Sequence, residues 1–103
     1  MVLGVIGFIQ AAALEVGQQN VTVNAVCPGP VETELTKESV AQSAKLKGIN
    51  PEDFFQGFFV DPTPLARIAQ PLAVARAVIF LTSDEAEFIT GTTPNISGGG
   101  EMD

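Results

Sequence analysis

The sequence contains no His, no Tyr and no Trp, and Cys27 is its single cysteine. One cysteine cannot form an internal disulfide, and without His a zinc site has almost no ligands, so we expect no metal site. Because Cys27 lies in an apolar run, we interpret it as a small buried hydrophobic residue. Positive charge is also scarce, since five Lys and Arg face twelve Asp and Glu and give a formal charge of −7. This balance argues against partners that attract basic proteins, namely nucleic acids and anionic membranes.

No targeting or membrane-spanning segment is evident. Residues 1–16 are strongly apolar, but no basic residues precede them and Glu15 falls within a helical pattern, which argues against a signal peptide. No apolar stretch is long enough to cross a bilayer. We therefore expect a cytoplasmic protein. With 103 residues, 46% of them hydrophobic, the chain can hold one small packed domain at most.

Hydrophobic spacing predicts helices and two short strands. Residues 3–16 have the period of a helix that is apolar on nearly every side, with Gly17 as its left-handed cap. Residues 21–26 are β-branched and predict a buried parallel strand, and residues 92–96 predict a second strand. Further helices are expected over residues 34–47, after Asn50, and from Pro71 onward. The fold class is therefore α/β, with two parallel strands and three to four helices.

Two strands of this size cannot cover a first helix that is apolar all round. The first strand would also have an open edge, where the backbone groups have no partner. The sequence therefore has the character of a part of a larger sheet.

Four of the seven Phe residues lie within six positions, at Phe54, Phe55, Phe58 and Phe59. Two interpretations are open. The rings can form a packed corner, or they can form a hydrophobic lid over a substrate.

Three stretches together resemble the classical short-chain dehydrogenase/reductase family. Residues 23–33 (Val-Asn-Ala-Val-Cys-Pro-Gly-Pro-Val-Glu-Thr) match its strand, Asn, Pro-Gly turn and following Thr. Residues 63–67 (Thr-Pro-Leu-Ala-Arg), Gln70-Pro71 and residues 77–84 (Ala-Val-Ile-Phe-Leu-Thr-Ser-Asp) match the next helix and its ends. Residues 88–91 (Phe-Ile-Thr-Gly) through Gly98-Gly99 match the closing strand and tail. The order and spacing are those of the C-terminal part of the family's Rossmann-like, doubly wound parallel sheet.

The resemblance implies a single partial domain over residues 1–103, with residues 34–62 as the substrate-loop region and a small apolar alcohol or carbonyl as substrate. It implies NAD or NADP as the cofactor, with Pro28, Gly29, Val31 and Thr33 bordering the nicotinamide. The Val31 backbone would bond the carboxamide, and the Thr33 hydroxyl would reach the carboxamide or a phosphate. The alternative for residues 28–30 is a turn that binds nothing.

The family's dinucleotide loop, catalytic Ser and Tyr-x-x-x-Lys have no counterpart in this sequence, and by spacing the Lys would fall near Val2. We therefore assign no catalytic residue. Two functions are open. In the first, the chain is the C-terminal segment of an NAD(P)-dependent oxidoreductase, inactive by itself. In the second, it is a non-catalytic interaction module that pairs with itself, as a homo-oligomer, or with a full-length relative or the missing N-terminal half.

Overall fold

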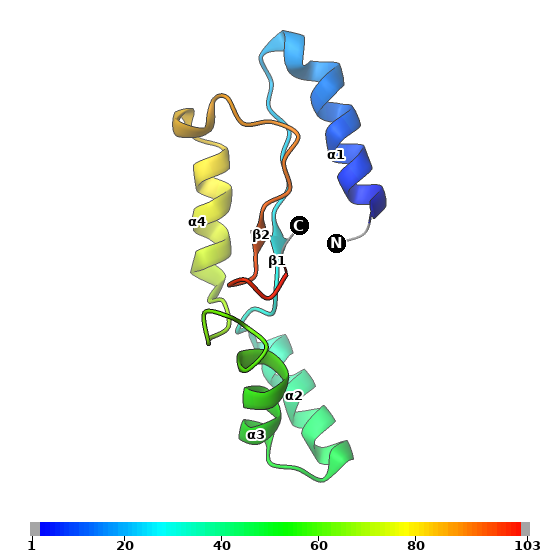
Figure 1. Cartoon of the computed structure of the whole chain (residues 1–103), viewed down its shortest axis with the longest axis vertical. Helices are drawn as coiled ribbons and strands as arrows, with labels where there is room; N and C mark the ends of the chain where they lie inside the picture. Colours follow the sequence, from blue (N-terminus) through cyan, green and yellow to red (C-terminus); the bar gives the residue numbers. More distant parts are fainter. Residues whose placement is uncertain (1–2, 102–103) are drawn as a thin grey trace. The chain divides into compact units, whose positions relative to one another are not determined.

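The computed structural model describes residues 3–101, which form two compact units (Figure 1). The first unit holds residues 3–27 and 75–94, and the second holds residues 28–74 and 95–101. The described residues contain four α-helices and one two-stranded sheet of β1 (Cys27–Pro28) and β2 (Asn95–Ile96). The backbone hydrogen bonds that join residues 23–29 to residues 91–96 run in the parallel pattern. The predicted α/β class is therefore confirmed.

Helix α1 (Leu3–Val16) coincides with the predicted first helix. Only Ile9 and Ala13 of this helix are buried, whereas Leu3 and Leu14 are 84% and 85% exposed. The helix is thus as apolar as predicted but is covered on one side only. Within the first unit, the extended segment that follows runs between α1 and α4 (Pro71–Leu81) (Figure 1).

The predicted left-handed cap at Gly17 is wrong. A 3₁₀ turn, η1 (Gly17–Gln19), continues the helix, and Asn20 takes the left-handed conformation with φ of 60°. The Asn20 N–H donates to the Gly17 carbonyl at 3.0 Å, which closes the turn. Asn adopts this conformation more readily than most residues because its short polar side chain bonds locally.

Residues 21–26 pair with the second extended segment as predicted, but the regular strands have other limits than the predicted ones. Residues 21–26 are extended, yet regular strand begins only at Cys27, and the second strand begins at Asn95 instead of Thr92. The Ala25 N–H donates to the Thr92 carbonyl at 3.1 Å. In a regular parallel ladder, the residue two places after Thr92 then donates its N–H to the Ala25 carbonyl. That residue is Pro94, which has no N–H. The ladder is incomplete there for this reason.

Asn24 ties the two extended segments together through its side chain. Its Oδ1 accepts from the Thr92 N–H at 3.0 Å and from the Thr92 hydroxyl at 2.7 Å, and its Nδ2 donates to the Ile89 carbonyl at 3.1 Å. The side chain thus replaces ladder bonds that the backbone does not make. This is the structural role that an Asn in an apolar strand implies.

The second unit is built on capped helices. Helix α2 (Glu34–Lys47) begins at the Thr33 cap and ends at Gly48, whose φ is 68°. Helix α3 (Pro51–Phe55) begins at Asn50, whose side chain accepts from the Glu52 N–H at 2.8 Å. A π-helical turn, η2 (Gln56–Val60), follows directly. The buried residues of this unit are Val40, Ala44, Thr63 and Ile68.

Helix α4 begins at Pro71 as predicted, and the short turn η3 (Asp84–Ala86) follows it. No residue of α4 is buried, so this apolar helix also lacks cover. Within residues 3–101, no helix combines the length and the hydropathy that a membrane span requires.

Candidate functional site: the turn after β1

The turn between β1 and α2 brings together all four predicted cofactor residues, Pro28, Gly29, Val31 and Thr33. The Gly29 N–H donates to the Ile96 carbonyl at 3.0 Å, which anchors the turn to β2. A Cβ at Gly29 would lie 3.1 Å from the Cα of Ser97 and 3.2 Å from its Cβ. The close neighbour of the Gly29 backbone in this structure is thus the chain itself. The need for glycine there therefore follows from strand packing.

Val31 lies at the centre of the turn and is half-buried. It forms an isolated parallel bridge with Ala69: the Glu32 N–H donates to the Ala69 carbonyl at 2.8 Å, and the Ala69 N–H donates to the Pro30 carbonyl at 3.3 Å. The Val31 carbonyl accepts from the Thr36 hydroxyl at 2.6 Å. The Val31 N–H, in contrast, has no hydrogen-bond partner among residues 3–101. The turn thus holds one backbone donor in a fixed position and leaves it available.

Thr33 is the N-cap of α2. Its Oγ1 accepts from the Thr36 N–H at 3.2 Å and lies 3.2 Å from the Thr36 hydroxyl. Because the Thr36 hydroxyl proton is directed to the Val31 carbonyl, the proton in the contact between the two hydroxyls comes from Thr33. The Thr33 hydroxyl is therefore engaged both as acceptor and as donor. A ligand would have to share it with the helix cap.

The charge around the turn is mainly negative. The Gln70 amide donates to the Glu32 carboxylate, and Lys37 Nζ lies 3.6 Å from the carboxylate of Glu34. The nearby cation is thus already paired, although weakly, because both side chains are exposed. In the part of the chain that the structure describes, no group of three His, Cys, Asp or Glu residues could hold a metal ion. Val2, where the spacing places the family's Lys, lies outside the described residues.

The Phe residues after α2 pack against one another. Phe54 and Phe58 stack with ring centroids 5.3 Å apart, and Phe58 and Phe59 meet edge to face at 5.1 Å. Lys47 Nζ lies 5.3 Å from the centre of the Phe54 ring. Phe58 is nevertheless 61% exposed. The cluster is therefore a packed corner that also presents an apolar surface, so both interpretations retain support.

Thr63, a buried polar residue before α4, was not among the predicted site residues. It is 9% exposed, and its hydroxyl donates to the Phe59 carbonyl at 2.7 Å. Its methyl group would lie 2.9 Å from a Cβ at Gly98, whose φ is 62°. Thr63 thus connects the Phe-containing turn η2 to the glycine-rich tail. In the sequence, Thr63 stands out only as the first residue of the family-like stretch of residues 63–67.

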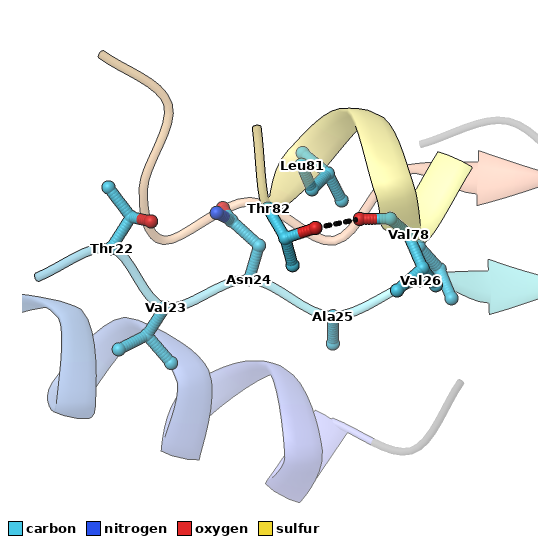
Figure 2. Close-up of a pocket in the computed structure, with 8 residues that line it drawn as sticks. All are labelled: Thr22, Val23, Asn24, Ala25, Val26, Val78, Leu81 and Thr82. Carbon is cyan, nitrogen blue, oxygen red and sulfur yellow. Dashed lines mark hydrogen bonds between the residues drawn. The ribbon is translucent and has the colours of Figure 1, made fainter. Parts of the chain in front are cut away.

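A hollow of about 280 Å³ lies in the first unit. It is lined by backbone and side chains of the first extended segment and by the C-terminal turn of α4: Thr22, Val23, Asn24, Ala25, Val26, Val78, Leu81 and Thr82 (Figure 2). The Thr82 hydroxyl donates to the Val78 carbonyl of its own helix at 3.1 Å. The Thr82 hydroxyl is thus engaged within its own helix.

Known proteins match the chain over nearly its full length. The family model described as enoyl-(acyl carrier protein) reductase matches residues 3–101. An acetoacetyl-CoA reductase from Shinella zoogloeoides is 38% identical over 96 residues, which are 93% of this chain and 35% of the relative. A 3-oxoacyl-[acyl-carrier-protein] reductase from Vibrio harveyi is 38% identical over 96 residues, again 93% of this chain and 34% of the relative. The chain therefore spans about a third of the length of these curated relatives.

Solved structures agree with these matches. A short-chain dehydrogenase family protein from Francisella tularensis superposes with a TM-score of 0.87 at 35% identity, covering 93% of this chain and 39% of that one. A sorbitol-6-phosphate 2-dehydrogenase from Erwinia amylovora gives a TM-score of 0.86 at 29% identity, covering 98% and 40%. The motifs, the parallel strands and these matches lead to one conclusion: the chain belongs to the short-chain dehydrogenase/reductase family and corresponds to a part of its Rossmann-like fold.

Proposed function

We propose that residues 28–33 border the nicotinamide of NAD or NADP in an oxidoreductase that acts on an alcohol or a carbonyl. The observation that carries this proposal is the unpartnered Val31 N–H, held in place by the bridge to Ala69. A carboxamide oxygen is the kind of acceptor that a fixed backbone donor binds well. In this proposal residues 1–103 are one partial domain of the enzyme, and residues 34–62 are its substrate loop.

The substrate side is supported by the names of the relatives and by the Phe cluster. The relatives are named for acetoacetyl-CoA and for 3-oxoacyl groups carried by acyl carrier protein. We propose a 3-oxo group on an apolar acyl chain as the substrate, with the exposed face of Phe58 as a surface for that chain. The cytoplasmic location remains a prediction.

Residues 1–103 are proposed to be inactive by themselves. The sequence has neither a Tyr nor a His, so it offers no phenol or imidazole to exchange a proton with a carbonyl oxygen at neutral pH. The only thiol, Cys27, is buried. In this proposal residues 28–33 position the cofactor, and the proton transfer depends on groups outside this sequence.

A chimera tests the cofactor contact. The segment of the Shinella zoogloeoides reductase that aligns with this chain is replaced by residues of this chain, and the KM for NADPH and NADH is measured with acetoacetyl-CoA. Val31→Pro removes the N–H and is expected to raise the KM for the cofactor about tenfold, because a lost hydrogen bond costs about 1 kcal/mol or slightly more. Val31→Ala keeps the N–H and serves as the matched control.

Two results would contradict the proposal. One is a Val31→Pro chimera whose KM for the cofactor equals that of the Val31→Ala chimera. The other is turnover of acetoacetyl-CoA by residues 1–103 alone, which would show that the chain holds its own catalytic group.

A second function, an interaction module, is favoured by the surface of the first unit. Large apolar side chains are exposed on both of its helical segments, among them Phe8 at 71% and Ile79 at 65%. Among the described residues of this unit, only Ile9, Ala13, Cys27 and Ala86 are buried. A surface of this kind is typical of a segment that is covered by another polypeptide.

A further inference from the structure

Among residues 3–101, Thr63 is the only polar residue that is buried, at 9% exposure. A buried hydroxyl is costly unless it is hydrogen-bonded, and this one donates to the Phe59 carbonyl at 2.7 Å. The acceptor lies in η2, the π-helical turn that also carries Phe58. The ring proposed as the surface for the acyl chain thus belongs to the turn that Thr63 holds.

The two prolines beside Thr63 explain why its hydroxyl is needed. Proline has no N–H, so Pro62 and Pro64 cannot donate to the carbonyls at the end of η2. The Thr63 N–H donates to the Val60 carbonyl at 3.0 Å and is therefore not available to Phe59. The side chain of Thr63 donates to the Phe59 carbonyl in place of a backbone group. One residue thus satisfies two carbonyls at the end of the turn.

The methyl group of Thr63 lies against the glycine-rich tail. A Cβ at Gly98 would lie 2.9 Å from this methyl carbon, so the tail approaches this closely only because Gly98 has no side chain. The Leu65 N–H donates to the Gly98 carbonyl at 3.1 Å, which bonds the tail to the residues that follow Thr63. Thr63 therefore contacts η2 through its hydroxyl and the tail through its methyl group.

Ring contacts connect the Phe59 backbone to the exposed ring of Phe58. Phe59 is half-buried and meets Phe55 edge to face, with ring centroids 5.6 Å apart. Phe58 meets Phe59 edge to face at 5.1 Å and stacks on Phe54 at 5.3 Å. Aromatic pairs at these separations attract one another in preferred geometries. A shift of the Phe59 backbone would therefore also move the ring of Phe58, which is 61% exposed.

We propose that Thr63 is a positioning residue for the acyl chain of the substrate. Because it holds both the Phe59 carbonyl and the glycine-rich tail, it fixes the Phe58 ring where the distal carbons of an acyl chain lie against it. The inference rests on the proposed acyl surface of Phe58 and adds the residue that sets its position. Thr63 touches neither the reacting carbonyl nor the cofactor in this proposal, so its effect should grow with the length of the acyl chain.

The chimera with the Shinella zoogloeoides reductase tests this role. KM and kcat are measured with acetoacetyl-CoA, whose acyl chain is short, and with 3-oxooctanoyl-CoA, whose chain is longer. Thr63→Val keeps the methyl group and removes the hydroxyl. We expect it to raise the KM for 3-oxooctanoyl-CoA about fivefold, the effect of one lost hydrogen bond, and to leave the KM for acetoacetyl-CoA and for NADPH unchanged. Thr63→Ser keeps the hydroxyl and is the matched control.

Coupling to Phe58 separates positioning from general stability. Phe58→Ala removes the ring and should raise the KM for 3-oxooctanoyl-CoA at least about fivefold. If Thr63 acts through this ring, Thr63→Val should change that KM no further in a chimera that already has Phe58→Ala. Independent effects of the two substitutions would multiply instead.

Hydrogen exchange in the 103-residue chain tests the Thr63 hydrogen bond without any substrate. The Asp61 N–H donates to the Gln56 carbonyl within η2. Its exchange should become about fivefold faster in Thr63→Val and stay unchanged in Thr63→Ser. If Thr63→Val fails to fold, Thr63→Ala and Thr63→Ser give the same comparison, since both lack the methyl group and only the second keeps the hydroxyl.

Any of four results would overturn the inference: equal KM values for 3-oxooctanoyl-CoA in Thr63→Val and Thr63→Ser, an equal rise in KM for both acyl substrates and NADPH, multiplied effects in the double variant, or unchanged exchange of the Asp61 amide in Thr63→Val. Failure of the proposed function gives a different result. An unchanged KM for 3-oxooctanoyl-CoA in Phe58→Ala contradicts the acyl surface itself. A KM that rises in Phe58→Ala but not in Thr63→Val contradicts the positioning role alone.

Discussion

Replacing Asn24 by Ala is expected to open the bonded segments of the first unit. The side chain makes two hydrogen bonds to Thr92 and one to the Ile89 carbonyl, and Ala leaves these groups without their partner. Each such bond contributes about 1 kcal/mol net, so the local free energy of opening should fall by roughly 2–3 kcal/mol. At 1.4 kcal/mol per factor of ten, protection against hydrogen exchange should fall about 30- to 150-fold.

The assay is amide hydrogen exchange by NMR at Ala25, Cys27 and Gly91, which donate across the paired segments. Hydrogen exchange at single amides is preferable to a thermal melting curve. The first unit has few buried residues, and a sharp melting transition depends on a buried core. Thr92→Val removes the hydroxyl bond alone and should cost about 1 kcal/mol, or about a fivefold loss of protection. Thr93→Val is the control, because its side chain makes no hydrogen bond among the described residues. Unchanged protection in Asn24→Ala, or a loss in Thr92→Val as large as that in Asn24→Ala, would contradict this role of the Asn24 side chain.

Three further substitutions test the second unit. Gly98→Ala should destabilise the second unit by about 1–2 kcal/mol from the positive φ alone, and by more because the new methyl group would lie 2.9 Å from Thr63. The loss of stability should appear as faster hydrogen exchange of the Leu65 amide, which donates to the Gly98 carbonyl. Gly57→Ala meets open space and should stabilise η2 by up to about 1 kcal/mol, measured by urea unfolding. Thr33→Ala should cost about 1 kcal/mol and lower the helical circular dichroism signal, whereas Thr33→Ser should not.

Helix positions in this chain follow from local chemistry. The period of apolar residues predicted α1 at its observed limits, and the helix starts at Asn50 and Pro71 were correct because a cap or a proline acts on the residues beside it. The tie at Asn24 was also predictable, since a polar side chain in an apolar strand needs partners. The cap at Gly17 was wrong because the chain continues through a 3₁₀ turn to Asn20, a residue that also tolerates the left-handed conformation.

Strand limits depend on a partner that the local pattern does not contain. Residues 21–26 have the composition of a strand, but regular pairing fails where Pro94 meets Ala25 in the partner segment. The two are brought together only by the fold, so neither stretch could reveal the mismatch by itself. The same is true of Gly29, whose close neighbour is Ser97.

The sequence by itself determined the α/β class, the starts of the helices, the family resemblance and the absence of a Tyr or His for proton transfer, because each of these depends on residue types and short spacings. The tertiary structure decided which backbone groups are used. It showed that the Thr33 hydroxyl is engaged in a helix cap, that the Val31 N–H is available, and that one edge of residues 22–26 is unpaired. The helix cap is local, but the bridge of Val31 to Ala69 and the pairing of residues 22–26 join segments far apart in the sequence. The bond from Asn24 to Ile89 spans 65 positions, and such pairings are fixed only when the chain folds.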